Sequence, residues 1–197
     1  MFWQKEPKNL KIIVLIIVMC VVFGTLFLIY SQKKPKKSEL PSEIEVIETE
    51  TGKIVRNRAE GYEVTIPKEW RIEKGATNIK QTLYSPEVPP EGLIRGCKIE
   101  QGVIKRKTTI KELKKEIEIE ISEAFNPEEI EINKYEEINI NGYNALKHIF
   151  KTYLGHTITI LIPLKERLLN FTMFTSEQDL EKCNQYFDEI IKTILIK

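Results

Sequence analysis

The hydrophobic pattern divides the chain into one continuous apolar run and a longer part in which apolar and polar residues alternate. Residues 12–30 read IIVLIIVMCVVFGTLFLIY and contain no charged side chain. At about 1.5 Å of rise per residue this run spans roughly 28 Å as a helix, which matches the hydrocarbon core of a bilayer. The sequence therefore predicts a tail at residues 1–11, a transmembrane anchor at 12–30, and a tethered domain after it.

Two other interpretations of the apolar run fit less well. A cleaved signal peptide ends in small residues of the A-x-A type, whereas this run contains no alanine and continues too far. A lipoprotein signal needs a small residue directly before the modified cysteine, but Cys20 follows Met19. Cys20 is then a small apolar residue of the helix. The run is expected to remain as an anchor that contacts membrane lipid.

The charges beside the anchor leave its orientation open. Three lysines precede it and four follow it in the sequence KKPKK. This bias slightly favours a cytoplasmic domain, in which case KKPKK could lie on anionic lipid. A short basic tail before a first apolar segment is also typical of a signal anchor that exports the following domain. The lysines alone do not decide between the two.

Residues 31–56 are predicted to be a linker. Pro35 and Pro41 break helices, and five glutamates between residues 39 and 50 favour a solvated chain. The segment IEVIETETGKIVRN alternates weakly around Thr51 and Gly52, so a loose hairpin at 44–57 is an alternative. The folded domain is expected to comprise residues 57–197.

In that domain, alternating positions first predict strands at 62–66, 70–72, 79–84 and 93–104. The turn-rich segment SPEVPPEG at 85–92 separates the last two. Along 93–104 one face carries Leu93, Cys97, Ile99 and Val103. Arg95 and Gln101 interrupt that face, so it is expected to be only partly buried.

Two amphipathic helices are predicted. Thr109 and Glu112 form a capping box before residues 110–124, although the repeat EIEIEI also fits a strand. The second helix closes the chain, capped by Thr175 with Gln178 or by Ser176 with Asp179. Its apolar positions form one stripe, which we expect to pack on the sheet: Leu180, Cys183, Phe187, Ile190 and Ile194.

Between the helices the pattern indicates a meander of antiparallel strands. Asn141-Gly142 is a strong two-residue hairpin signal, and it joins a strand ending at Ile140 to one at 143–153. A second turn is predicted at Leu154-Gly155, followed by strands HTITILIP and 168–174. The predicted fold is α+β, an antiparallel sheet flanked by helices.

Three segments resemble the PsbP-like family: GYEVTIPKEW, NGYNALKHIF and LLNFTMFTSEQDLEKCNQYFDEIIKTI. The resemblance covers residues 60–197 and implies an α/β/α sandwich, here preceded by one transmembrane helix. The family includes extrinsic subunits of the oxygen-evolving complex and many exported or membrane-anchored bacterial domains without assigned function. An anchor of its own argues against a photosystem role. The exported relatives favour a single-pass protein of the cell membrane whose C-terminal domain lies outside the cytoplasm.

Motifs for chemistry are nearly absent from the sequence. It contains neither G-x-x-x-x-G-K-[ST] nor G-x-G-x-x-G, which argues against the familiar nucleotide sites. If Leu154-Gly155 is the turn, His148 and His156 lie about 17 Å apart, too far to share one metal. Each is then interpreted as a surface or strand histidine. We therefore predict no catalytic residue, no metal ligand and no cofactor, and leave any cofactor-binding residues unassigned.

Cysteines and charge refine this picture slightly. Cys97 and Cys183 both lie on core-facing stripes, so they form a disulfide in an exported domain or remain two buried thiols. Asn170-Phe171-Thr172 matches a glycosylation sequon, but it lies within a predicted strand and is interpreted as chance. A net charge of +1 gives no indication of nucleic-acid binding.

Three functions fit these features. The favoured one is a non-catalytic, membrane-anchored module that binds a protein partner or assists assembly at the membrane surface. The alternative is a ligand-binding or sensory module with a cleft beside the SPEVPPEG loop. An enzyme with a nonstandard carboxylate site is the weakest, because the glutamate runs are typical of solvated faces. A concave pocket with converging polar groups would distinguish these hypotheses.

Overall fold

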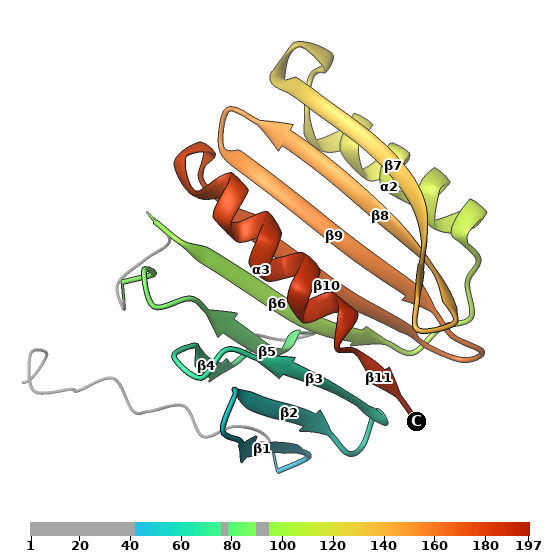
Figure 1. Ribbon diagram of the computed structural model, residues 1–197. Coiled ribbons are helices and arrows are strands. Elements are labelled where there is room, and N and C mark those ends of the chain that lie inside the picture. Colours follow the sequence, from blue (N-terminus) through green and yellow to red (C-terminus); the bar gives the residue numbers. More distant parts are fainter. Residues whose placement is uncertain (1–41, 76–78, 90–94) are drawn as a thin grey trace, which may run out of the picture. The chain divides into compact units, whose positions relative to one another are not determined.

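The computed structural model describes residues 42–75, 79–89 and 95–197 (Figure 1). The predicted tail, the anchor at 12–30 and most of the linker lie outside these described residues. Within them, no helix combines the length and the apolar character needed to cross a bilayer.

A seven-stranded sheet is the centre of the domain, and all its neighbouring strands are antiparallel. Its spatial order is β4 (Arg71–Lys74), β5 (Ile79–Tyr84), β6 (Cys97–Ile104), β10 (Leu168–Thr175), β9 (Gly155–Pro163), β8 (Tyr143–Thr152) and β7 (Ile130–Ile140). The predicted meander is present, and Asn141 and Gly142 form its first turn with φ of 49° and 92°. Positive φ at both positions is what a type I′ hairpin requires, which explains this residue pair.

A second, four-stranded sheet has the order β1 (Ile44–Glu48), β2 (Lys53–Asn57), β3 (Tyr62–Ile66) and β11 (Leu195–Ile196). Because β1 and β2 belong to this sheet, the hairpin alternative is correct and the predicted linker at 31–56 extends too far. Two of the glutamates that indicated a solvated linker, Glu45 and Glu48, form cross-strand ion pairs. Glu45 lies 3.2 Å from Arg56 and 2.8 Å from Arg58, while Val55 in the same hairpin is fully buried.

Helix α2 (Ile110–Ala124) begins at the predicted capping box. The Thr109 side chain accepts a hydrogen bond from the Glu112 backbone N–H, and Glu112 Oε2 accepts one from Thr109 N at 2.8 Å. Two orphan donors of the first turn are thereby satisfied, which favours helix over the strand alternative. A short 3₁₀ turn, η1 (Pro127–Glu129), follows the helix and leads into β7.

Helix α3 (Leu180–Lys192) closes the domain after a 3₁₀ turn, η2 (Glu177–Asp179). The two helices lie on opposite faces of the large sheet: α3 crosses its front in Figure 1, and α2 lies behind β7 and β8. The α+β prediction with helices flanking an antiparallel sheet is confirmed for this part of the chain.

The larger core lies between α3 and the two sheets. Phe187 and Ile190 of α3 belong to one buried cluster with Phe171 of the large sheet and Val64 of the small sheet. A disulfide joins Cys97 on β6 to Cys183 on α3 within this core, and their Cα atoms are 5.5 Å apart. The helix is thus held both by apolar packing and by a covalent bond to the sheet.

Gln101 corrects the expectation of a partly buried face on β6. Its side chain is fully buried on the face with Cys97 and Ile99, and its Oε1 accepts a hydrogen bond from Nε2 of Gln81 on β5. A buried amide is tolerated when its polar atoms find partners. The neighbouring strand supplies a partner for Oε1, which the sequence of β6 alone could not indicate, whereas Gln101 Nε2 and Gln81 Oε1 have no hydrogen-bond partner among the described residues.

Candidate functional site

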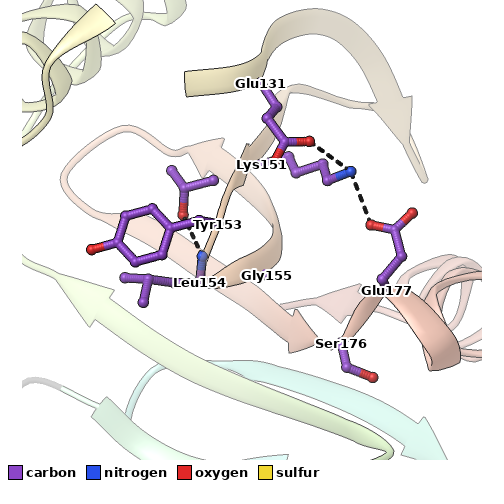
Figure 2. A pocket seen from close by; sticks show the side chains of 8 residues that line it. Glu131, Lys151, Tyr153, Leu154, Gly155, Ser176 and Glu177 are labelled. Atoms are coloured by element: carbon purple, nitrogen blue, oxygen red, sulfur yellow. Dashed lines mark hydrogen bonds and ion pairs between the residues drawn. The ribbon is translucent and has the colours of Figure 1, made fainter. Parts of the chain in front are cut away.

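The end of the large sheet where β8 turns into β9 carries a cavity of about 310 Å³. We call the residues around it the hairpin-tip surface: Glu131, Lys151, Thr152, Tyr153, Leu154, Gly155, Ser176 and Glu177. They come from three parts of the chain, namely β7, the β8–β9 hairpin and the segment that leads into α3 (Figure 2).

The turn itself presents two large apolar side chains to solvent. Tyr153 is 70% exposed and Leu154 is 74% exposed, and the two lie next to each other in Figure 2. The Leu154 backbone N–H donates to Thr152 Oγ1 at 3.2 Å. Gly155 has φ of 130°, and a Cβ there would lie 3.0 Å from the Thr175 carbonyl oxygen. Glycine is therefore required where the chain re-enters the sheet.

An ion-pair cluster lies beside this apolar tip. Lys151 Nζ lies 2.8 Å from Glu131 Oε2 and 3.0 Å from Glu177 Oε2, so the ammonium bridges two carboxylates (Figure 2). The two carboxylates raise the pKa of Lys151 above its ordinary value. The pKa of Glu177 is lowered, first by the hydrogen bond with His156 and then by Lys151. The cluster remains charged near neutral pH.

His156 lies on β9 behind the cluster and is 5% exposed. Its Nε2 is 2.5 Å from Glu177 Oε2, which fixes the position of the carboxylate relative to Lys151. The arrangement consists of fixed charges next to an exposed apolar pair. Such a surface is suited to binding, since an apolar patch with a polar rim is typical of interaction sites.

The histidine geometry differs from the prediction. The turn residues are Tyr153 and Leu154, so Thr152 pairs with Gly155 and His156 pairs with Lys151. His148 pairs with Thr159, only three positions along β8 from Lys151. An odd separation places the two imidazoles on opposite faces of the sheet. They are thus nearer in the ladder than the predicted 17 Å, but the sheet lies between them.

Both histidines lie on strands, as one of the two interpretations had it, but both are buried, so the interpretation as surface residues is wrong. His148 is 7% exposed, stacks on Tyr135 with ring centroids 4.7 Å apart, and has its Nε2 2.8 Å from Asn133 Oδ1. Burial lowers the pKa of His148 to about 4. Its imidazole is therefore uncharged at neutral pH.

Other site expectations have mixed outcomes. No group of three or more His, Cys, Asp or Glu side chains suited to a metal ion occurs among residues 42–75, 79–89 and 95–197. The cleft expected beside SPEVPPEG involves residues 90–92, which lie outside the described residues.

Tyr153 and Leu154 were missed as candidates. Their signal was two large apolar residues at a turn, where Gly, Asn, Asp and Pro are usual.

Comparison with known proteins gives one informative similarity. No family model matches the chain, and no curated protein matches it. The solution structure of cyanobacterial PsbP (CyanoP) from Synechocystis sp. PCC 6803 superposes with a TM-score of 0.51 at 11% sequence identity, covering 80% of this chain and 94% of that one.

Two weaker similarities carry no argument about fold. A crystal structure from Bacteroides thetaiotaomicron VPI-5482 has a TM-score of 0.42 at 10% identity, covering 69% of this chain and 45% of that one. The crystal structure of PA94, a protein of unknown function from Pseudomonas aeruginosa, has a TM-score of 0.41 at 14% identity, covering 79% and 99%. The similarity to CyanoP concerns the fold alone, and it supports a PsbP-like fold for this chain.

Proposed function

We propose that the protein is a membrane-anchored, non-catalytic module whose PsbP-like domain lies outside the cytoplasm and binds a protein partner through the hairpin-tip surface. The observation that carries the proposal is the exposure of Tyr153 and Leu154, at 70% and 74%, beside the fixed charges of Lys151 and Glu177. The apolar run at 12–30 supports the anchor.

The disulfide supports the location. Disulfides persist in oxidising compartments and are rare in the cytosol of most organisms. Cys97 and Cys183 are both fully buried and joined across the main core. A buried disulfide of this kind fits a structural role in an exported domain, which agrees with the orientation that the resemblance to exported relatives favours.

The chemistry of the hairpin-tip surface supports a protein as the partner. Tyr153 and Leu154 offer apolar area at the centre, and Tyr is enriched where proteins bind one another. Glu131, Lys151 and Glu177 surround it with charges of both signs, already held in place by mutual contacts. A complementary surface would bury the apolar pair and pair with the rim charges, with little ordering needed on this side.

Site-directed photo-crosslinking of the full-length protein in its native membrane tests this proposal. Tyr153 is replaced by the photoreactive p-benzoylphenylalanine, and Tyr143, an exposed tyrosine at the start of β8, is replaced in the matched control. We expect one discrete protein adduct from position 153 and none from position 143. Adding Leu154→Ser should reduce the adduct about tenfold or more, because burial of a leucine contributes about 1.5 to 3 kcal/mol.

Two outcomes would refute the protein-binding role. Identical adducts from positions 153 and 143 would show that contact at the tip is nonspecific. Adducts with lipid alone at position 153 would show that the tip lies against the membrane surface instead of a protein.

A further inference from the structure

A second cavity of about 310 Å³ lies between α2 and the central strands, away from the hairpin-tip surface. We call it the α2 cleft. One wall is apolar and is formed by Leu113, Ile117 and Ile121 on successive turns of α2. Leu161 and Leu168 extend this apolar surface onto β9 and β10. Ligand pockets in proteins commonly have about 300 to 1,000 Å³ and mostly apolar walls with a few placed polar groups.

The floor of the α2 cleft is polar. His148, Thr159 and Thr172 occupy paired positions on β8, β9 and β10, so they form one row across three strands. Thr172 Oγ1 donates to Asn170 Oδ1 at 2.8 Å, and Thr159 Oγ1 lies 3.3 Å from Thr172 Oγ1. The row therefore has a defined hydrogen-bond direction, with Asn170 at its end.

Unused hydrogen-bonding capacity remains on this floor. Asn170 accepts through Oδ1, which leaves its two amide N–H donors without a partner in the described part of the chain. His148 donates from Nε2 to Asn133 Oδ1, so the other ring nitrogen carries a lone pair. A molecule in the cleft thus meets the amide of Asn170 on one side and apolar side chains on the other.

The charges of the cleft argue against an anionic occupant. Arg106 is the cation on its lining, and its Nη2 is 2.6 Å from Glu116 Oε2. Glu120 adds a further carboxylate to the lining. His148 stays uncharged at neutral pH, so it adds no positive charge to the floor. An anion would meet two carboxylates there and one arginine whose guanidinium is already paired with Glu116 through Nη2.

We propose that the α2 cleft binds a small, uncharged molecule with an apolar skeleton and a hydroxyl or carbonyl group on one side. The skeleton packs against Leu113, Ile117 and Ile121, and the polar group bonds with Asn170 and the threonine row. This site shares no residue with the hairpin-tip surface, so each can fail without the other.

Methyl NMR of the isoleucines in the full-length protein, reconstituted in lipid nanodiscs, tests the cleft with 1-naphthol as the probe. Naphthol is uncharged at neutral pH and has an apolar ring with one hydroxyl. Its ring current should shift the Ile117 and Ile121 methyl signals in a saturable way. Naphthalene-1-sulfonate has the same ring and a negative charge, and we expect it to bind at least tenfold more weakly.

A pair of matched substitutions separates the cleft from general effects. Thr159→Val keeps the side-chain shape and removes one hydroxyl of the floor, and should weaken naphthol binding about fivefold, the effect of one lost hydrogen bond. Thr157→Val makes the same change on the same strand and face, outside the cleft lining. It should leave the affinity unchanged. Absent Ile117 and Ile121 shifts, equal binding of the sulfonate, or equal weakening by both substitutions would each overturn the proposal.

Discussion

At the scale of single residues, His148 is a titratable group whose environment differs strongly from that of a free side chain. His148 is 7% exposed, and its ring contacts the rings of Tyr135 and Phe150. Its Nε2 forms a hydrogen bond with Asn133 Oδ1. A protonated His148 at this buried position would lose most of the hydration of its positive charge. Burial therefore favours the neutral imidazole and lowers the pKa of His148. The folded protein therefore holds His148 in its neutral form at neutral pH.

This burial predicts a dependence of stability on pH. The pKa of His148 is about 4 in the folded protein and about 6.5 when unfolded, so the unfolded chain binds the extra proton between these values. Stability should therefore fall as the pH is lowered from about 6.5 to 4, and level off below. The full shift corresponds to about 3 kcal/mol.

Carboxylates with lowered pKa, such as Glu45 and Glu63, also lose stabilising contacts on acidification. The measurement is therefore the difference between the wild type and His148→Gln in denaturant melts at pH 4 to 7, with the His148 pKa read from its ring proton signals. A titration midpoint near 6.5, or equal pH dependence of both proteins, would contradict the prediction.

Residue-scale features were the hardest to predict from sequence. Gln101 and His148 are polar residues at buried positions, and a single strand does not reveal whether a neighbouring strand or helix supplies a partner. The Asn133 contact depends on the pairing of β7 with β8. The α2 cleft was missed for the same reason, because its floor combines residues of three strands.

At the scale of elements, α3 is the helix whose packing the sequence predicted best. Its stripe at helical spacing is buried as expected at Cys183, Phe187 and Ile190. The periodicity of 3.6 is a local signal, since it needs only that one face meets a core. Strand β11 was not predicted. Its two residues form a strand only by pairing with β3, which is distant in the sequence and reaches them through the fold of α3.

Phe187→Ala tests how α3 is held. Phe187 is 1% exposed in the main core, so truncation should lower the free energy of unfolding by about 3 to 5 kcal/mol. Glu189→Ala, on an exposed position of the same helix, should cost less than about 0.5 kcal/mol. Both are compared by denaturant melts with the disulfide intact. Equal small losses would show that packing of this face does not stabilise the domain.

The two hairpin turns show that an error of one residue in a predicted turn changes the predicted pairing of both strands. Asn141-Gly142 was predicted correctly because this pair itself determines the backbone conformation. The second turn was placed one residue too late, and that shift moved the β8–β9 pairing by two positions. The error arose because Tyr153 and Leu154 are unusual turn residues, which is also why they are candidates for binding.

At the scale of the whole domain, the two sheets and α3 share one core, so the small sheet is part of the domain's stability. Val55 of β2 is fully buried in the same cluster as Phe187, and Ile44 of β1 is 8% exposed there. Strand β2 also covers an edge of β3 along its full length. The sequence placed the domain start at residue 57 because acidic residues of β1 resembled a solvated linker.

This arrangement predicts that the domain needs residues before 57. A protein comprising residues 42–197 should unfold in one cooperative step, whereas residues 59–197 lack β1 and β2. Removing Ile44 and Val55 from the core should cost roughly 3 to 5 kcal/mol, a large share of the 5 to 15 kcal/mol typical of a domain. The β3 edge would also be uncovered, which favours association.

Circular dichroism melts in urea compare the two proteins directly. We expect a clearly lower midpoint for residues 59–197, or aggregation that depends on protein concentration, because β3 would then pair only with the two residues of β11. Val55→Ala in the longer protein serves as a milder control and should lower the midpoint by a smaller amount. Identical midpoints for 42–197 and 59–197 would show that the β1–β2 hairpin adds nothing to stability, and the domain would then begin where the hydrophobic pattern alone placed it.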